Sequence, residues 1–123
     1  GSMKLGRAGE VLPFSLKSRV EDVPMTNPEE LIGAAHAGCF SMALSSLIEE
    51  EGKVPGTVET SAKVTLEQRD DGFWISEINL ITRGSNQAMT NDEFVALAEK
   101  AKTTCPVSKL YSSATITLDA ALA

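Results

Sequence analysis

The chain has 123 residues, 42% of them hydrophobic, and a net charge of −6, which suits one domain with its own core but not two. Its 11 Lys and Arg residues are spread singly, so no basic stripe could neutralise phosphates and we expect no nucleic acid partner. No apolar run approaches the roughly 20 residues of a membrane span, and no signal segment is evident. We therefore expect a single domain over residues 1–123, located in the cytoplasm and without a membrane partner. Gly1 and Ser2 resemble a tag remnant and are left outside the expected fold.

An alternating pattern near the start of the chain predicts a half-buried strand over residues 11–20. Leucine, phenylalanine and valine side chains fall on one side of this stretch, and serine, lysine and arginine side chains, including Arg19, fall on the other. Pro13 has no amide hydrogen to donate to a neighbouring strand. The strand is therefore expected to be irregular or to lie at a sheet edge.

A long helix is predicted from residue 28 to about residue 51. Asn27 is a suitable N-cap, Pro28 fits the first turn, where no amide partner is needed, and Glu30 is placed to reach back in a capping box. Beyond this turn the helix carries apolar or very small side chains on nearly every face. We expect it to be enclosed on all sides, with Cys39 in a tight and mostly dry pocket.

A β-hairpin is predicted after this helix. Residues 57–68 and 73–82 both alternate between apolar and polar side chains, and Asp70–Asp71–Gly72 between them has the chemistry of a hairpin turn. On the returning strand, Trp74 is expected to share one face with Ile78 and Leu80.

A second helix and a closing strand complete the chain. The helix is predicted to begin at Thr90, which can form a capping box with Glu93. Its apolar face, continued by one turn, reaches Cys105, and Pro106 either ends the helix or starts a short new turn. Residues 115–122 alternate again and predict the last strand.

The order strand, long helix, hairpin, helix and strand predicts an α+β fold with a mainly antiparallel sheet around the central helix. A helix of about 24 residues is about 36 Å long. A chain this short has too little sheet to surround it, so we expect an intertwined two-fold homodimer with a shared core.

Two cysteines, Cys39 and Cys105, lie 66 positions apart. A buried cysteine is often small core filler. A mid-helix thiol with a second thiol at a helix end also suits a residue that is oxidised and then resolved by its partner. His36 shares the side of the helix that carries Cys39 and could raise its thiolate content, although a hydrogen-bonded interior histidine is the simpler explanation. One His and two Cys lack the spacing of a zinc site.

Three segments carry a resemblance to a known family: TNPEELIGAAHAGCFSMALS (residues 26–45), AKTTCPVSK (101–109) and ITLDA (116–120). They resemble the OsmC type of the OsmC/Ohr family, the osmotically inducible protein C and organic hydroperoxide resistance proteins. The resemblance covers nearly everything from Leu16 onward. It implies the family's homodimeric α+β fold and a thiol peroxidase that reduces organic hydroperoxides to alcohols in oxidative and osmotic stress.

The resemblance also implies roles for four residues. Cys39 matches the peroxidatic cysteine, Cys105 the resolving cysteine, Arg19 the active-site arginine and Glu29 the glutamate that orients it. An arginine stays charged and can keep a nearby thiol anionic. Glu29 precedes Cys39 by ten residues on the same helix, about 15 Å, so the two cannot touch within one chain. Either Arg19 bridges part of this gap, or Glu29 of one chain acts with Cys39 of the other, which we favour.

The implied cycle forms a Cys39 sulfenic acid and then a Cys39–Cys105 disulfide. It uses no metal, flavin or haem, and an external dithiol, in the wider family a lipoylated protein, reduces the disulfide. An apolar pocket around Cys39 would favour bulky organic or fatty acid hydroperoxides. The competing hypothesis is a non-enzymatic redox sensor or small-molecule-binding protein that uses the same pocket. A third interpretation treats both thiols as inert filler.

The chain departs from the family at its start. Family members usually have extra strand residues before the segment that matches residues 12–19, whereas only residues 3–10 precede it here. A shortened or missing first strand would leave a sheet edge open, or would leave the partner chain to cover it.

Overall fold

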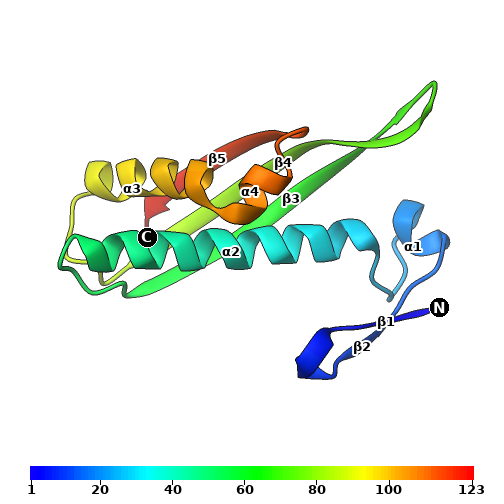
Figure 1. Cartoon of the computed structure of the whole chain (residues 1–123), viewed down its shortest axis with the longest axis horizontal. Coiled ribbons are helices and arrows are strands. Elements are labelled where there is room, and N and C mark those ends of the chain that lie inside the picture. Colours follow the sequence, from blue (N-terminus) through cyan, green and yellow to red (C-terminus); the bar gives the residue numbers. More distant parts are fainter.

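The computed structural model describes residues 1–123 as two β-sheets and a layer of helices (Figure 1). In chain order, its elements are β1 (Ser2–Lys4), the 3-10 turn η1 (Gly6–Ala8), β2 (Val11–Pro13), α1 (Lys17–Val20), α2 (Pro28–Glu50), β3 (Thr57–Arg69), β4 (Gly72–Ser85), α3 (Asn91–Thr104), α4 (Pro106–Leu110) and β5 (Thr115–Leu122).

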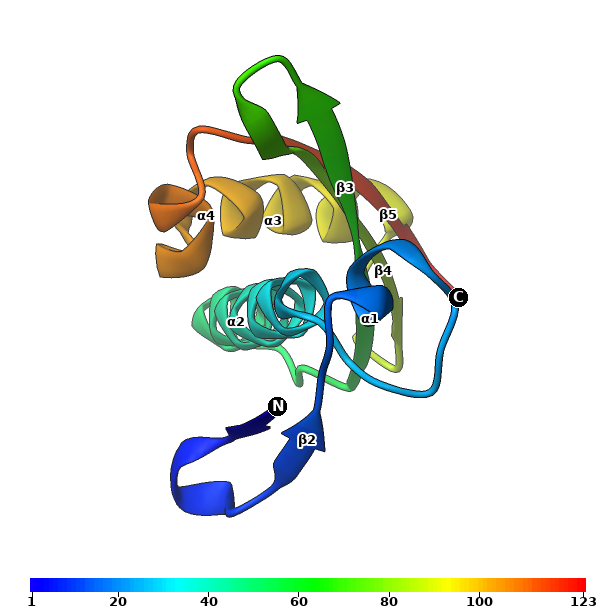
Figure 2. The same ribbon diagram turned by 90° about the vertical axis from the view of Figure 1, so that its right-hand side faces the viewer.

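The larger sheet has the strand order β3–β4–β5. Strands β3 and β4 form the predicted antiparallel hairpin, whereas β5 runs parallel to β4, so α3 and α4 form the crossover between these two strands. Helices α2 and α3 pack beside each other on one face of this sheet (Figures 1 and 2). The predicted α+β class with a mainly antiparallel sheet and a long central helix is therefore confirmed.

The hydrophobic core lies between this sheet and the two long helices. Fully burying one large apolar side chain contributes about 1.5–3 kcal/mol, so the core fixes how the helices sit on the strands. Its buried members come from α2 (Phe40, Leu44, Ile48), β4 (Leu80) and α3 (Phe94, Ala98, Ala101).

Helix α2 begins as predicted. The Asn27 side chain accepts a hydrogen bond of 2.8 Å from the Glu30 amide, and Pro28 occupies the first turn. At Gly33 a Cβ atom would lie 3.2 Å from Val64 Cγ2 and 3.3 Å from the Ala62 carbonyl oxygen on β3. The glycine therefore allows α2 to lie close on the sheet.

One face of α2 is uncovered in the single chain. Ala34, Ala35 and Gly38 are exposed, and 76% of Met42 is exposed. The prediction that the helix would be enclosed on all sides is thus wrong for one chain.

Helix α2 is also long and apolar enough, by length and composition, to cross a membrane, so the statement that no run approaches that length is wrong too. Core helices meet the same criteria, and α2 contributes three side chains to the core described above.

The strand predicted over residues 11–20 is wrong beyond Pro13. Strand β2 ends there, and Arg19 lies on the short helix α1. Ser18 Oγ donates a hydrogen bond of 2.7 Å to the Ser15 carbonyl and accepts one of 3.2 Å from the Ser15 amide. Such local side-chain bonds to the backbone compete with strand pairing, and they explain the turn into α1.

Strands β1 and β2 form a small hairpin that is separate from the larger sheet (Figures 1 and 2). Ser2 pairs with Pro13, and the amino group of Gly1 donates a 3.0 Å hydrogen bond to the Phe14 carbonyl. Gly1 and Ser2, which the sequence analysis set aside, therefore take part in this hairpin. The first strand is present but only three residues long.

A β-bulge in the long hairpin corrects the prediction for Trp74. The register shifts between Thr65 and Leu66, so that Leu66 pairs with Ile75 and Ser76 is the extra residue of β4. A one-residue shift moves the following side chains to the opposite face. Ile75 consequently lies with Ile78 against one pocket, whereas Trp74 is 44% exposed.

Helix α3 agrees with its sequence signals. Thr90 and Glu93 form the predicted capping box at its start. The helix ends at Cys105, which is fully buried on the core side, and Pro106 begins the short helix α4. The second thiol is therefore held at a rigid corner between two helices.

Candidate active site

Cys39 and Cys105 lie close together where α2 passes the corner between α3 and α4. Cys39 is partly buried in the middle of α2, and Cys105 is fully buried. Both are free thiols, and the Cys105 side chain is near enough to hydrogen-bond Cys39. The fold thus brings together two thiols that are 66 positions apart in the sequence, as the redox-pair hypothesis requires.

The surroundings of Cys39 raise the pKa of its thiol above the ordinary value of 9.0. Burial is the largest cause, and the hydrogen bond with the Cys105 thiol adds to it, whereas the backbone amide of Val107 lowers the pKa. Because the thiolate is the nucleophilic form, one chain by itself leaves Cys39 mostly protonated at neutral pH. A positive charge near the sulfur would reverse this effect.

A second pair of polar side chains lies one helical turn away from the cysteines. His36 on α2 is fully buried, and its Nε2 atom lies 2.7 Å from Ser108 Oγ on α4. The edge-to-face packing of its ring with Tyr111 gives a centroid separation of 5.5 Å. Burial lowers the pKa of His36 below 6.5, so the ring is neutral at neutral pH. His36 is therefore a hydrogen-bonded interior histidine, as the simpler explanation holds.

Arg19 and Glu29 form an ion pair between α1 and the first turn of α2. Arg19 Nε lies 3.1 Å from Glu29 Oε1, and the two side chains are 35% and 13% exposed. The second carboxylate oxygen, Oε2, is buried and has no hydrogen-bond partner within the chain. Asn27 Nδ2 donates a 2.7 Å hydrogen bond to the Ser18 carbonyl, which ties α1 to the start of α2 and positions the arginine.

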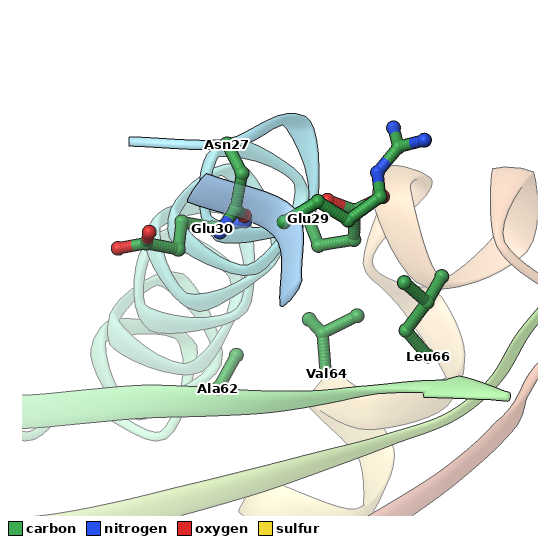
Figure 3. Close-up of a pocket in the computed structure, with 7 residues that line it drawn as sticks. Asn27, Glu29, Glu30, Ala62, Val64 and Leu66 are labelled. Atoms are coloured by element: carbon green, nitrogen blue, oxygen red, sulfur yellow. The ribbon is translucent and has the colours of Figure 1, made fainter. Parts of the chain in front are cut away.

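A pocket of about 200 Å³ lies beside this ion pair. Its apolar side is formed by Ala62, Val64 and Leu66, which project from β3 toward the helix end that carries Glu29 (Figure 3). The pocket therefore combines a charged wall with an apolar floor. Such a combination suits a molecule with one polar end and a hydrocarbon body.

The four predicted site residues form two separate pairs in one chain. Cys39 lies beside Cys105 and Arg19 beside Glu29, but ten residues of α2, about 15 Å, separate Glu29 from Cys39. Neither cysteine lines the pocket next to Arg19. No group of three or more His, Cys, Asp or Glu side chains that could hold a metal ion is found in the chain.

Two residues near the thiols were not identified from the sequence. Val107 offers its amide to Cys39, and Ser108 meets His36. A signal for both was available, because Pro106 is a typical first residue of a helix. A helical turn starting there places Ser108 three positions after Cys105, on the same side of the turn.

Comparisons with known proteins all point to one family. The sequence profile of the OsmC-like protein family matches residues 21–119. The chain is 45% identical over 107 residues to the peroxiredoxin OsmC of Escherichia coli (strain K12), covering 87% of this chain and 74% of that protein. It is 35% identical over 89 residues to the organic hydroperoxide resistance protein OhrA of Bacillus subtilis (strain 168), covering 71% and 60% of the two chains. A crystal structure of an organic hydroperoxide resistance protein OsmC from Legionella pneumophila superposes with a TM-score of 0.79 at 23% identity, covering 94% of this chain and 85% of that one.

Proposed function

This chain belongs to the OsmC-like protein family, and on that premise we propose that it is a cysteine-based thiol peroxidase that reduces organic hydroperoxides to alcohols. Relatives named peroxiredoxin and organic hydroperoxide resistance protein support a peroxide-detoxifying role. The observation that carries the proposal is the contact between the two free thiols. One of them, Cys39, is accessible enough to meet a substrate, and the other is buried beside it.

The proposed cycle has two chemical steps. The Cys39 thiolate attacks the distal oxygen of the hydroperoxide, the O–O bond breaks, and the alkoxide that leaves takes up a proton to become the alcohol, so that Cys39 becomes a sulfenic acid. The Cys105 sulfur then attacks the Cys39 sulfur and displaces water, which forms the disulfide. An external dithiol, such as a lipoylated protein, returns both thiols by disulfide exchange. The cycle needs no metal, flavin or haem.

Arg19 and Glu29 supply the positive charge in this proposal. The pKa of Cys39 is raised within one chain, so the thiol needs a cation to become a thiolate at neutral pH. Glu29 engages the Nε atom of Arg19, which leaves the terminal guanidinium nitrogens for other partners. Because about 15 Å of helix separates the two pairs, the guanidinium that serves Cys39 belongs to the second chain of a homodimer.

The uncovered surfaces support this dimer. The exposed face of α2 contains Gly38 and Met42, which lie one and three positions from Cys39 in the sequence. The buried Oε2 atom of Glu29 has no partner in its own chain, whereas buried carboxylate oxygens are normally hydrogen-bonded. A second copy that covers α2 would complete both regions.

The pocket beside Arg19, with its apolar floor, favours organic or fatty acid hydroperoxides over hydrogen peroxide.

Steady-state turnover tests the activity. With dithiothreitol or a lipoylated protein as reductant, the chain should consume many equivalents of cumene hydroperoxide. A redox sensor would stop after one equivalent. Inert thiols would show no loss of free thiol when hydroperoxide is added. Either of the last two results would overturn the proposal.

Subunit mixing tests the composite site. Arg19→Met is expected to lose most of the activity and Cys39→Ser all of it, but a dimer with one chain of each kind keeps one intact site. Random mixing makes half of the dimers of this kind, so about a quarter of the wild-type activity should return. A site contained within one chain predicts no recovery, and a mixture that stays inactive after subunit exchange has been verified would refute the two-chain arrangement.

A further inference from the structure

We infer that the hydrogen bond between His36 and Ser108 holds the resolving thiol in place, so that Cys105 captures the sulfenic acid of Cys39 before a second hydroperoxide does. This inference rests on the proposed function. His36 and Ser108 are positioning residues, because they touch neither the hydroperoxide nor its reacting oxygen atoms. They act through the placement of α4 against α2.

Two neighbouring contacts join α2 to the segment that begins at Cys105. On α2, His36 precedes Cys39 by three positions, and at the start of α4, Ser108 follows Cys105 by three positions. Residues three apart lie on the same side of a helix. The His36–Ser108 hydrogen bond of 2.7 Å therefore runs beside the Cys39–Cys105 contact, one turn away on each segment.

Because both groups are buried, water cannot readily replace this hydrogen bond. His36 is fully buried and Ser108 is 6% exposed, so bulk water has little access to either group if the bond breaks. The Val107 amide of α4 also reaches α2, but it bonds Cys39 itself, so the His36–Ser108 bond is the side-chain to side-chain hydrogen bond that joins α2 to α4 away from the reacting thiol. The loss of a buried hydrogen bond is most costly when it leaves a buried polar atom unsatisfied.

The resolving step needs such an anchor. To form a disulfide the two sulfur atoms must come within about 2.05 Å with a restricted dihedral angle. Helix α4 has only five residues and begins directly after Cys105, so its position sets that of the thiol and of the Val107 amide. Without the anchor, α4 would spend less time in the geometry for attack, and the sulfenic acid would persist long enough to be oxidised to the sulfinic acid.

Ser108→Ala is the primary test, and Ser41→Ala is its matched control. Ser41 Oγ also makes a 2.7 Å hydrogen bond from α2, but to Thr60 on β3. Reduced protein would be mixed with one equivalent of cumene hydroperoxide, quenched at intervals, and analysed by mass spectrometry for dimedone-trapped sulfenic acid and for disulfide. Ser108→Ala should form sulfenic acid at the wild-type rate but disulfide about tenfold more slowly, the factor expected for one hydrogen bond.

With excess hydroperoxide, Ser108→Ala should accumulate Cys39 sulfinic acid, whereas Ser41→Ala and Ser108→Thr, which keeps the hydroxyl, should behave like wild type. His36→Asn, whose side chain is too short to reach Ser108, serves as the second variant if Ser108→Ala fails to fold. Wild-type disulfide rates in the folded variants, or equal slowing in Ser41→Ala, would overturn the inference. If hydroperoxide does not oxidise even wild-type Cys39, the proposed function fails. Disulfide formation driven by diamide then tests the anchor by itself, with the same slowing expected in the same variants.

Discussion

The thiol region and the ion-pair region of this molecule are built in different ways. Cys105 and His36 are fully buried, and the elements that carry the thiols pack against one another. Arg19, in contrast, lies on the four-residue helix α1, after a small hairpin that forms its own sheet. Leu16 and Val20 on either side of Arg19 are 86% and 68% exposed.

The difference indicates that the two regions have different roles. The thiol region needs fixed distances, because two sulfur atoms have to meet, and a packed core supplies them. In the proposed mechanism, the ion-pair region supplies a charge to another chain, and that chain would cover the apolar side chains that are exposed here. Substitutions in the two regions can test this difference.

Substitution of the reacting thiol should have the largest effect. Cys39→Ser is expected to lose hydroperoxide reduction by at least about 10³-fold, because serine is not ionised at neutral pH and is a much weaker nucleophile. Cys105→Ser should still react once. Thiol titration without added reductant distinguishes the two, with two thiols lost per hydroperoxide in wild type, one in Cys105→Ser and none in Cys39→Ser. Equal behaviour of the two variants would contradict the division of roles between the cysteines.

A charged side chain on the exposed face of α2 should prevent a second chain from packing there. Met42→Asp should leave the isolated chain folded, since 76% of this residue is exposed, but it should dissociate the dimer and remove activity with it. Sedimentation and turnover would be measured together. Val54→Asp, at a residue that is 69% exposed beyond the end of α2, is the control and should change neither. An active monomeric Met42→Asp protein would show that the two regions can cooperate within one chain.

Removal of the cation should have an intermediate effect. Arg19→Met should raise the pKa of Cys39, because the thiolate loses a nearby positive charge, and alkylation at neutral pH should slow by about ten- to a hundredfold. Iodoacetamide rates against pH give this pKa directly. Arg83→Met is the control, because Arg83 forms a 3.1 Å ion pair with Asp119 and is not part of the proposed site. An unchanged Cys39 pKa in Arg19→Met would show that the Arg19–Glu29 ion pair does not act on the Cys39 thiol.

The smallest effect is a pH dependence of stability in the thiol region. Burial lowers the pKa of His36 below 6.5, so the unfolded chain binds a proton more readily than the folded chain. This contribution to stability is complete above pH 6.5 and is lost as the pH falls below it. The free energy of unfolding of wild type, measured with urea, should therefore fall between about pH 7 and pH 5.5, and that of His36→Gln should fall less. The same loss in both proteins would assign it to other groups.

Elements with local signals were predicted well from the sequence. The start of α2 follows from Asn27 and Pro28, and the start of α3 from the pairing of Thr90 with Glu93. The placement of Cys105 on the core side followed from helical spacing, because a helix repeats its faces at fixed intervals. These signals lie within a few residues of the feature that they determine.

Features that depend on distant or irregular contacts were missed. The turn of the chain into α1 depends on hydrogen bonds between Ser15 and Ser18, which an alternating pattern does not reveal. The bulge at Ser76 moved Trp74 to the other face, because one extra residue reverses the alternation. The contact between Ser108 and His36 joins residues 72 positions apart, and no pattern of either segment alone predicts it.

The parallel pairing of β4 with β5 has a consequence for how the protein is made. Parallel neighbours require a crossover, and here the crossover carries Cys105 and is closed only when β5, residues 115–122, docks. During synthesis Cys39 emerges from the ribosome 66 residues ahead of Cys105. Nascent chains therefore pass through a period in which the first thiol has no resolving partner, and a Cys39 that is oxidised during that period cannot form its disulfide until the crossover is complete.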